Sequence, residues 1–422
     1  MSRNNPAGAP VGTPDRLVTL DFIRGVAVLG ILFANIVAFA HPHIAYSWPG
    51  GLPEPMSKAD TGVWLAQYLV IDGKMRGLFT LLFGVGMAVF MDRAWERGQT
   101  RWLQIRRLLW LGAFGLAHFF FLFWGDILFL YAIAGLAVLP MLRWRPEGLL
   151  CGGLVWYAAG ALYTTGAFAS TVMLEQSPQA QQAARADYKA IEARIDTRLE
   201  EAAAERAAYT EGSYATEIRY VAERQSGQLW QDPLFAIIET IPLMMIGIAL
   251  YRFGLFGGFP GVGIDVGTLR RWAWAGIVVG GGASLALALW AMGRGFPPYL
   301  SQFVASDAAQ LPRLAMILGY AVLLAQWAPR AAAGWVGSRL VAAGRMAFSN
   351  YIGTSVAMML VFRHWAGGQF GELGRVEMLA PVLLGWVLML AWSKPWLAHF
   401  RYGPLEWLWR CLTYWKVFPF RR

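Results

Sequence analysis

The residues best suited to acid–base chemistry are a histidine and an aspartate in and just after an apolar run. His118 lies within the run 103–123, and Asp126 follows it in the sequence Gly125-Asp126-Ile-Leu. A carboxylate that accepts a hydrogen bond from one imidazole nitrogen fixes the tautomer and raises the basicity of the other nitrogen. This pair could therefore form a general base. A neutral histidine that hydrogen-bonds another helix is the alternative explanation.

Three more polar residues accompany the first apolar run. Asn35 lies inside that run, and His41 and His43 follow it closely. At 100° per residue, Asn35 shares a stripe of about 60° with Asp21 and Arg24 on one face of a helix. Asn35 would lie about 21 Å farther along the helix than Asp21, so the stripe carries polar groups into both halves of the run.

Cations border or interrupt several other apolar runs. Lys74 and Arg76 precede the second run, Arg106 and Arg107 lie in the third, and Arg345 lies in the ninth. Charged groups in hydrocarbon are costly and usually face a cavity or a partner, which makes each of them a functional candidate. Snorkelling of the charged ends toward the lipid headgroups is the alternative.

Neutral hydrogen-bonding side chains also occur inside the apolar runs. Tyr131 lies near the start of the fourth run, and Asn350 and Tyr351 lie in the ninth. Hydrogen bonds between helices are the usual explanation for such residues. A contact with substrate is the alternative that makes them candidates for binding.

Cysteine usage and charge exclude two classes of site. Cys151 and Cys411 are too few and too far apart for a disulfide framework or a zinc cluster, so we expect no metal. The net charge of +10 could suit nucleic acid, but no polar segment carries a basic stripe with interleaved aromatic residues. Orientation in a membrane explains the excess of cations, and we predict no nucleic-acid partner.

The elements that must position these residues are membrane helices. Of the 422 residues, 57% are hydrophobic and only 15% are charged, whereas about a quarter of a soluble domain is charged. Apolar runs of near-spanning length cover residues 22–40, 77–91, 103–123, 127–142, 149–173, 233–251, 272–292, 312–328, 340–362 and 379–393. The sequence therefore predicts an all-α polytopic membrane protein with about ten transmembrane helices, in contact with the lipid bilayer.

Lysine and arginine set the predicted orientation, because short cytoplasmic loops retain positive charge. If the N-terminus is inside, every short cytoplasmic loop is rich in arginine, as is the tail that follows the tenth run. Both ends of the chain are therefore predicted to lie in the cytoplasm. The first run is too long for a signal-peptide core and no small-residue cleavage site follows it, so it is predicted to be retained. We expect a multi-pass protein of a bacterial inner membrane.

One long polar segment, 174–232, separates two sets of five runs. It is rich in Ala, Gln, Glu and Arg, which predicts an extracytoplasmic helical insertion. A solvated helical hairpin and a lid over a substrate site are the two interpretations. Since no internal repeat is found, we expect one integral domain over 1–422. It has five-helix halves at 15–173 and 233–422, and the second ends in an interfacial cytoplasmic tail.

Taken together, these motifs resemble the YeiB-like family (domain of unknown function 418). The resemblance runs from Arg16 to Tyr414. It rests on the opening Leu20-Asp21-Phe-Ile-Arg24-Gly25 with Asn35, on Lys74-Met-Arg76 through Phe83-Gly84, on His118 with Gly125-Asp126 and Tyr131, on Gly344-Arg345 through Asn350-Tyr351, and on Gly403 through Arg410. The opening is also similar to that of a wider set of transmembrane acyltransferases related to heparan-alpha-glucosaminide N-acetyltransferase.

The resemblance to those acyltransferases implies a function. Such enzymes take an acyl group, for example acetyl, from cytoplasmic acyl-CoA and deliver it to an acceptor on the far side of the membrane. A glycan, a lipid-linked sugar or a small hydroxyl or amine compound would be the acceptor here. Acyl-CoA is then a co-substrate, and its phosphates need a cationic inner mouth.

This implied function divides the candidate residues into three groups. Those assigned to acyl-CoA binding are Asp21, Arg24, Arg106, Arg107 and Arg345. Those assigned to other substrate contacts are Lys74, Arg76, Tyr131, Asn350 and Tyr351. The catalytic candidates are His118 and Asp126, Asn35 as an oxyanion donor, and His41 and His43. The last two are included because the glucosaminide enzyme carries its catalytic histidine in the loop about ten residues after the asparagine, whereas here the histidines follow Asn35 by six and eight residues.

Two other classes of function remain open. A transporter or exporter of a small or lipid-linked metabolite would use the same polar groups as a binding site and would need no basic histidine. An assembly or scaffold subunit would have every buried polar group satisfied by another part of the protein. Any of the three could act as a homo-oligomer.

Overall fold

The computed structural model of the chain describes residues 13–52, 55–229, 236–257 and 265–422. Helices dominate these residues, and no strand longer than an isolated bridge occurs among them. Five segments are long and apolar enough to cross a membrane: Val18–Ala40, Lys58–Glu96, Val266–Gly293, Pro298–Ala331 and Leu379–His399. Two shorter apolar helical segments are Leu128–Arg143 and Ala347–Phe362. The all-helical membrane class predicted from the sequence is thereby confirmed.

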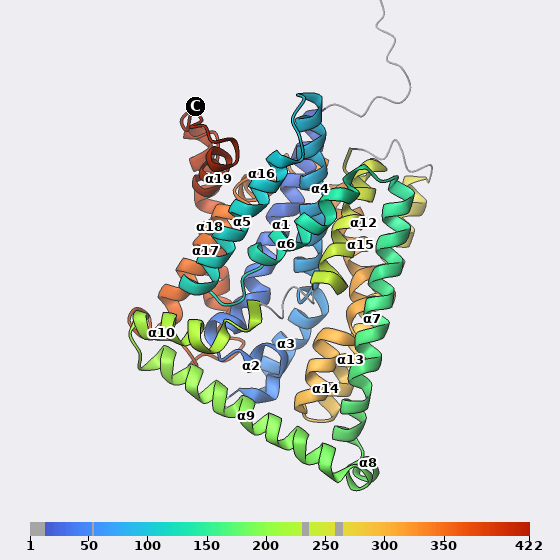
Figure 1. Ribbon diagram of the computed structural model, residues 1–422, viewed down its shortest axis with the longest axis vertical. Coiled ribbons are helices and arrows are strands. Elements are labelled where there is room, and N and C mark those ends of the chain that lie inside the picture. Colours follow the sequence, from blue (N-terminus) through green and yellow to red (C-terminus); the bar gives the residue numbers. More distant parts are fainter. Residues whose placement is uncertain (1–12, 53–54, 230–235, 258–264) are drawn as a thin grey trace, which may run out of the picture.

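The longer helices lie side by side along the long axis of the molecule (Figure 1). They are α1 Thr13–Ala40, α4 Lys74–Glu96, α5 Trp102–Phe121, α6 Leu128–Val138, α7 Pro146–Gln176, α12 Ile241–Arg252, α13 Val266–Gly293, α15 Gln310–Ala331, α16 Trp335–Arg345, α17 Ala347–Phe362 and α18 Leu379–His399. The other α-helices are α2 Ile44–Ser47, α3 Lys58–Val70, α8 Pro178–Ala183, α9 Arg185–Thr210, α10 Tyr214–Tyr220, α14 Pro298–Gln302 and α19 Pro404–Tyr414. Within the described residues, each of the ten apolar runs falls on helix.

The ninth apolar run, 340–362, is divided between two helices. Met346 breaks the helical path between α16 and α17. Next to this break, the backbones of α16 and α1 are in contact. A side chain on Gly344 would overlap the carbonyl of Asp21, and one on Gly25 would overlap the carbonyl of Leu340, so glycine is needed at both positions. The central helix α1 also packs against α4, α15 and α17, so it forms the middle of the bundle.

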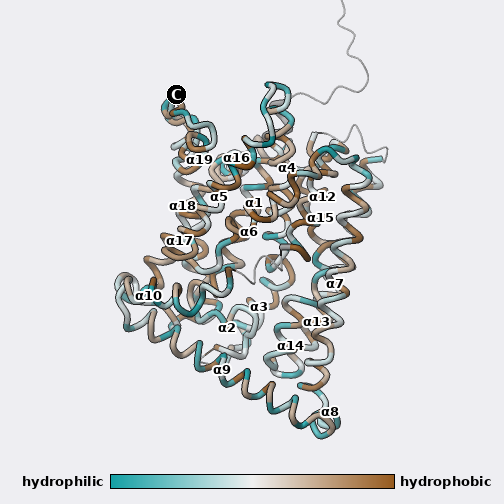
Figure 2. Tube along the Cα trace, in the orientation of Figure 1, coloured by the Kyte–Doolittle hydropathy of each residue, from teal (hydrophilic) through white to brown (hydrophobic). Residues whose placement is uncertain are grey.

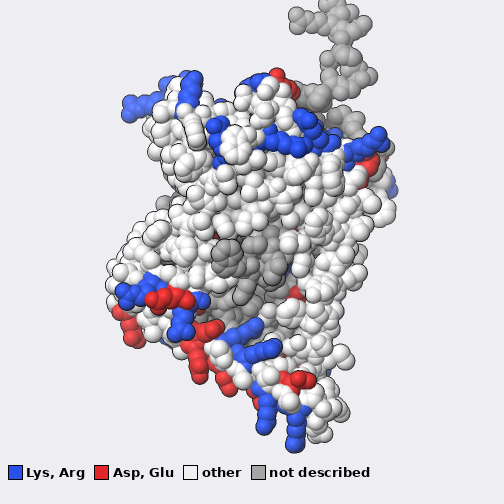
Figure 3. Space-filling model, viewed as in Figure 1, with Lys and Arg blue, Asp and Glu red and all other residues white. Residues whose placement is uncertain are grey.

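The two ends of the bundle differ in charge. At one end, which we call the basic end, Arg93 and Arg97 close α4, Arg101 precedes α5 and Arg145 precedes α7. Lys and Arg gather there, at the top of Figure 3, whereas acidic and basic side chains alternate along α9 at the opposite end, the α9 end. Between the two ends, hydrophobic residues predominate along the helices (Figure 2).

The predicted polar insertion, 174–232, is helical as expected over its described part, 174–229. After α7 the chain forms α8, α9 and α10, and α9 runs across one end of the bundle (Figure 1). One face of this segment is docked: the Glu205 carboxylate accepts from the backbone N–H of His43 at 2.8 Å, and Arg198 donates to Gln302 at 3.0 Å. Glu205 is only 2% exposed, so the segment is packed onto the bundle as well as solvated.

Candidate functional site

His118 lies at the centre of a buried hydrogen-bonded triad. Its Nδ1 is 2.8 Å from Asp126 Oδ1, and its Nε2 is 2.8 Å from Ser355 Oγ. The imidazole and the carboxylate are almost fully buried, and Ser355 is 1% exposed. The structure thus brings together the predicted pair and adds a serine from α17 that sequence reasoning missed.

Local structure fixes Asp126 in this position. The chain turns after α5, and the other carboxylate oxygen, Asp126 Oδ2, accepts from the backbone N–H of Phe129 at 2.7 Å in the first turn of α6. Helices α5 and α6 approach each other closely at Gly115, where any side chain would overlap the Phe129 backbone nitrogen. Asp126 therefore caps a helix with one oxygen and orients His118 with the other.

The geometry of the triad suits the tautomer of His118 that a general base requires. In that tautomer, His118 Nδ1 donates to the Asp126 carboxylate and Nε2 presents a lone pair to the Ser355 hydroxyl. The Tyr351 carbonyl oxygen, at 3.2 Å, is a second acceptor for the same hydroxyl. Carboxylate, imidazole and hydroxyl thus stand in the order used for activating a serine nucleophile.

A cavity of about 550 Å³ extends from the basic end toward this triad. Its deepest polar residues are Tyr131, whose hydroxyl is 2.7 Å from Thr80 Oγ1, and Tyr351. The ring of Tyr351 packs against His118 with 4.9 Å between ring centroids. Tyr351 therefore separates the cavity from the imidazole.

Arginines dominate the charge of this cavity. The lining arginines are Arg24, Arg93, Arg97, Arg107, Arg345 and Arg410. Arg24 is paired with Asp21 at 2.8 Å, and within the described chain the other five have no ion pair. The one carboxylate of the lining, Glu406, accepts from the backbone N–H groups of Phe348 and Ser349, so it caps α17 instead of pairing with an arginine.

The five predicted acyl-CoA residues are placed unequally. Arg24, Arg107 and Arg345 line the cavity, and Asp21 is held against Arg24. The Arg107 guanidinium lies 4.3 Å from the ring centroid of Trp409 and 4.4 Å from that of Phe90. Arg106 does not line the cavity, and its guanidinium lies over Trp415 instead. The sequence reasoning missed Arg93, Arg97 and Arg410, which share no spacing signal with the others.

The predicted substrate contacts are dispersed. Tyr131 and Tyr351 lie at the cavity floor, whereas Asn350 is satisfied within the bundle by the Ala343 carbonyl, Ser393 and Trp392. Lys74 is fully buried and donates to the Tyr68 carbonyl. Arg76 pairs with Glu239 at 2.8 Å. Neither cation lines the cavity.

The two loop histidines lie toward the α9 end, apart from His118. His41 Nε2 is 2.8 Å from the Leu373 carbonyl oxygen, and burial lowers the pKa of His41 to about 4. His43 is exposed, and desolvation of its ring together with the charge of Arg198 lowers its pKa. An aromatic layer separates them from His118, because Phe123 packs on both Phe39 and His118. Asn35 is half-buried on α1.

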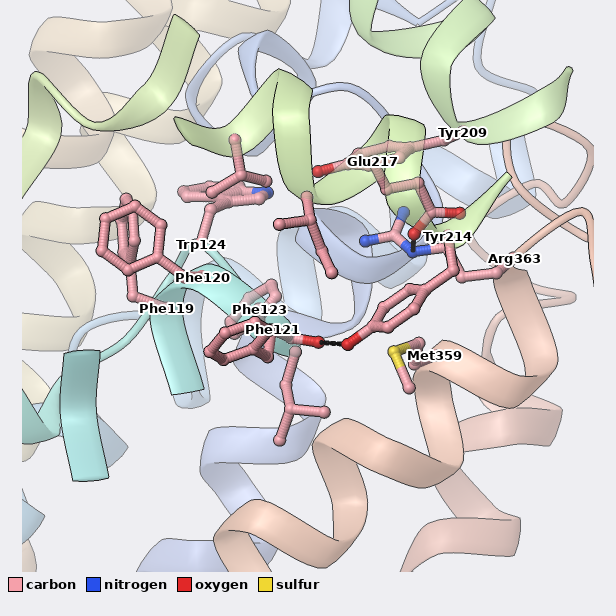
Figure 4. Close-up of a pocket in the computed structure, with 13 residues that line it drawn as sticks. Phe119, Phe120, Phe121, Phe123, Trp124, Tyr209, Tyr214, Glu217, Met359 and Arg363 are labelled. Carbon is pink, nitrogen blue, oxygen red and sulfur yellow. Dashed lines mark hydrogen bonds and ion pairs between the residues drawn. The ribbon is translucent and has the colours of Figure 1, made fainter. Parts of the chain in front are cut away.

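A second, aromatic pocket lies between the turn after α5 and α10 (Figure 4). The Tyr214 hydroxyl donates to the Phe121 carbonyl at 2.6 Å, and Arg363 faces Glu217 at 3.2 Å. Its volume of about 10 Å³ gives room for one water molecule and not for a substrate. This pocket is a small gap in the packing between the insertion and the bundle.

Comparison with known proteins places the chain among uncharacterised relatives. A family model described as "Protein of unknown function (DUF418)" matches residues 265–416. The chain is 32% identical over 410 residues to the uncharacterized protein YeiB of Escherichia coli (strain K12), which covers 94% of this chain and 96% of that protein. It is 28% identical over 423 residues to the uncharacterized protein YxaH of Bacillus subtilis (strain 168), with 96% of each chain covered. No solved structure matches the chain.

Proposed function

The chain belongs to the YeiB-like family of DUF418 proteins. From the cavity and from the resemblance of its opening motif to transmembrane acyltransferases, we propose that it is a membrane-embedded acyltransferase. In this proposal an acyl group moves from cytoplasmic acyl-CoA to an extracytoplasmic acceptor. A glycan, a lipid-linked sugar or a small compound with a hydroxyl or amine is the acceptor class. The observation that carries the proposal is the arginine-lined cavity that ends against Tyr351 and, behind it, His118.

The proposed topology has ten crossings of a bacterial inner membrane, with both chain ends and the basic end in the cytoplasm. The five long apolar segments and the two shorter ones support membrane insertion. The concentration of Arg93, Arg97, Arg101 and Arg145 at the loops of one end supports its cytoplasmic placement by the positive-inside rule. Acyl-CoA is a cytoplasmic metabolite, so the cavity is then open to the compartment that holds it.

The charge of the cavity suits the phosphates of CoA. Guanidinium groups bind phosphate through two parallel hydrogen bonds, and each such contact contributes about 1.5–3 kcal/mol. Five lining arginines have no ion pair among the described residues, so they can bind an anion without first leaving a carboxylate. The cavity volume of about 550 Å³ also falls within the usual range for small-molecule sites, about 300–1,000 Å³.

The position of His118 suits a general base. A CoA ester that enters from the basic end with its phosphates among the arginines directs its acyl end toward Tyr131 and Tyr351. His118 lies directly behind Tyr351, with its tautomer fixed by Asp126. A base held in this way typically accelerates a reaction by about 100- to 10,000-fold.

The proposal is tested with purified protein in proteoliposomes. Calorimetry should detect binding of CoA and acetyl-CoA, and radiolabelled acetyl-CoA added to the face that carries the basic end should release free CoA as label reaches an acceptor on the other side. If CoA does not bind, the acyltransferase proposal fails. Passage of intact labelled compound across the membrane without release of CoA would instead support a transporter.

A further inference from the structure

We propose that Ser355 is a catalytic nucleophile that carries the acyl group as an ester between CoA and the acceptor. This inference rests on the proposed acyltransferase function and adds a covalent intermediate to it. It is motivated by the hydrogen-bonded row of Ser355, His118 and Asp126 next to the cavity floor.

Two other buried hydroxyl groups nearby bond to carbonyls of their own helices, and neither has an imidazole partner among the described residues. Thr354, the neighbour of Ser355 on α17, donates to its own helix at 2.9 Å from the Asn350 carbonyl. The Ser393 hydroxyl donates to the Met389 carbonyl at 2.6 Å. Ser355 differs because its oxygen is closer to His118 Nε2, at 2.8 Å, than to its own helix carbonyl, at 3.2 Å. A hydroxyl bonded to an oriented imidazole can lose its proton as it attacks.

Access to Ser355 depends on Tyr351. Tyr351 and Ser355 are four residues apart on α17, so they share a face and are separated by about 6 Å along the helix axis. Tyr351 lines the cavity, and among the described residues its hydroxyl is held by one hydrogen bond, of 3.4 Å, from the backbone N–H of Ile127. Rotation of this one ring would join the cavity to the triad, which makes Tyr351 the gate for the thioester.

Tyr351 also supplies a polar group where charge develops. Within the described chain its hydroxyl proton has no acceptor, because the hydroxyl oxygen accepts from Ile127 and donates to nothing. A phenol that rotates toward the incoming thioester can donate this proton in a hydrogen bond to the carbonyl oxygen. Such a donor stabilises the negative oxygen of a tetrahedral intermediate.

The chemistry balances in two steps. In the first, Ser355 Oγ attacks the thioester carbonyl, His118 Nε2 takes the hydroxyl proton, the carbon–sulfur bond breaks, and the proton passes to the thiolate to release CoA. In the second, the acceptor hydroxyl or amine attacks the Ser355 ester, His118 takes the acceptor proton and returns it to Ser355 Oγ as the ester bond breaks. No oxidant, metal or other reactant is needed.

A covalent carrier fits the one-sided geometry of the cavity. The lining residues extend from the basic end to Tyr131 and Tyr351, and aromatic packing around Phe123 lies beyond them toward the α9 end. With a covalent carrier, acyl-CoA from the basic end and the acceptor from the other side need not occupy the cavity at the same time. An ester on Ser355 stores the acyl group after CoA leaves and before the acceptor arrives.

The decisive experiment is the half-reaction without acceptor. An acyl-enzyme exchanges radiolabelled free CoA into acetyl-CoA in purified proteoliposomes, whereas a mechanism that needs both substrates at once does not. We expect exchange by the wild-type protein, and mass spectrometry should find acetyl on Ser355. Ser355→Ala should lower exchange by about 100-fold or more while it still binds CoA. Thr354→Ala, which removes the adjacent hydroxyl, should leave exchange unchanged.

A cysteine variant supplies the chemical signature. Ser355→Cys should acquire a thioester that neutral hydroxylamine cleaves, whereas the wild-type oxygen ester should need alkaline hydroxylamine. A merely structural serine would give no such change of lability.

Two results would overturn the covalent step. Transfer to an acceptor with no exchange in its absence, or acetyl found on another residue, would reject Ser355 as the carrier and leave the acyltransferase proposal intact. Absence of CoA binding would reject both proposals together.

Discussion

The arginines that line the cavity differ in their partners from arginines elsewhere in the molecule. Outside the cavity lining, Arg252 pairs with Asp92 at the basic end, and further ion pairs lie at the α9 end and in the half of the bundle next to it. These further ion pairs join Arg76 with Glu239, Arg206 with Glu372, and Arg363 with Glu217. At the basic end, five of the six cavity arginines have no such partner among the described residues.

This difference separates a structural role from a binding role. Arg363 and Glu217 are almost fully buried, and breaking such a pair leaves an uncompensated charge that costs several kcal/mol in a low-dielectric interior. Arg76 and Arg206 are 41% and 42% exposed, so their pairs contribute less. Cations that line a solvent-accessible cavity remain hydrated until a ligand displaces water. We therefore interpret the α9 end as a lock that holds the insertion to the bundle and the basic end as a site for an anionic ligand.

The largest expected effect comes from breaking the lock. In Arg363→Met, the Glu217 carboxylate stays buried without its cation, and the guanidinium also leaves the ring of Tyr209, whose centroid it approaches to 3.6 Å. We expect a loss of about 3 kcal/mol in the free energy of unfolding, measured by denaturation in detergent. CoA affinity should not change.

A second substitution checks this explanation. Glu217→Gln combined with Arg363→Met removes both charges, so the double variant should recover part of the lost stability. A lower CoA affinity in the correctly folded single variant would break the division between the two ends.

The next effect concerns the catalytic histidine at the cavity floor. His118→Gln keeps hydrogen-bonding groups for Asp126 and Ser355 but has no basic nitrogen, so acyl transfer should fall by about 100-fold or more while the melting temperature changes little. Activity would be followed as free CoA released by proteoliposomes.

The loop histidines provide the matched comparison. His41→Ala combined with His43→Ala should retain most activity, because both side chains lie toward the α9 end. An inactive loop variant together with an active His118→Gln protein would place the chemistry at the α9 end and reverse our assignment.

A smaller effect is expected at the mouth of the cavity. Arg345→Gln removes one phosphate contact and should weaken acyl-CoA binding by about 10-fold in calorimetry, since a charge-assisted contact contributes about 1.5–3 kcal/mol. Arg339→Gln on the same helix is the matched control, because Arg339 lies over Trp335 and does not line the cavity. Equal losses in the two variants would indicate a general effect of net charge.

The smallest effect is a pH dependence at the α9 end. Burial raises the pKa of Glu205 from 4.5 to about 7, so the folded protein holds a proton there that the unfolded chain loses between those values. This group's contribution to stability therefore decreases as pH rises from about 4.5 to about 7. Glu205→Gln should raise the free energy of unfolding at pH 8 by about 1 kcal/mol and change it little at pH 4.

Two effects determine the size of the stability gain expected for Glu205→Gln. The attraction of Arg363 for the carboxylate is lost with the charge. The side-chain amide that this substitution introduces can still be paired. Within the described chain the buried Oε1 of Gln225 has no hydrogen-bond partner, and after a flip of the Gln225 amide this oxygen can accept from the new NH₂ group. A destabilised variant at pH 8 would show that the Glu205 charge contributes to the lock.

Much of the architecture was predictable because its signals are local. Each apolar run and the polar composition of 174–232 indicate helix over a few turns of chain, and the described parts of these segments are largely helical. The pairing of His118 with Asp126 was also within reach, because only a short turn separates the end of α5 from the start of α6.

Tertiary structure alone decided which polar groups meet. Ser355 lies 237 residues from His118, and no spacing rule joins positions on helices whose neighbours are unknown. The same limit applies to Arg106 and Arg107, because adjacent residues point about 100° apart and only the position of α19 determines which one faces the cavity. Hydrophobic pattern therefore determined the helices and their class, whereas the packing of helices distant in sequence determined the cavity, its unpaired arginines and the triad.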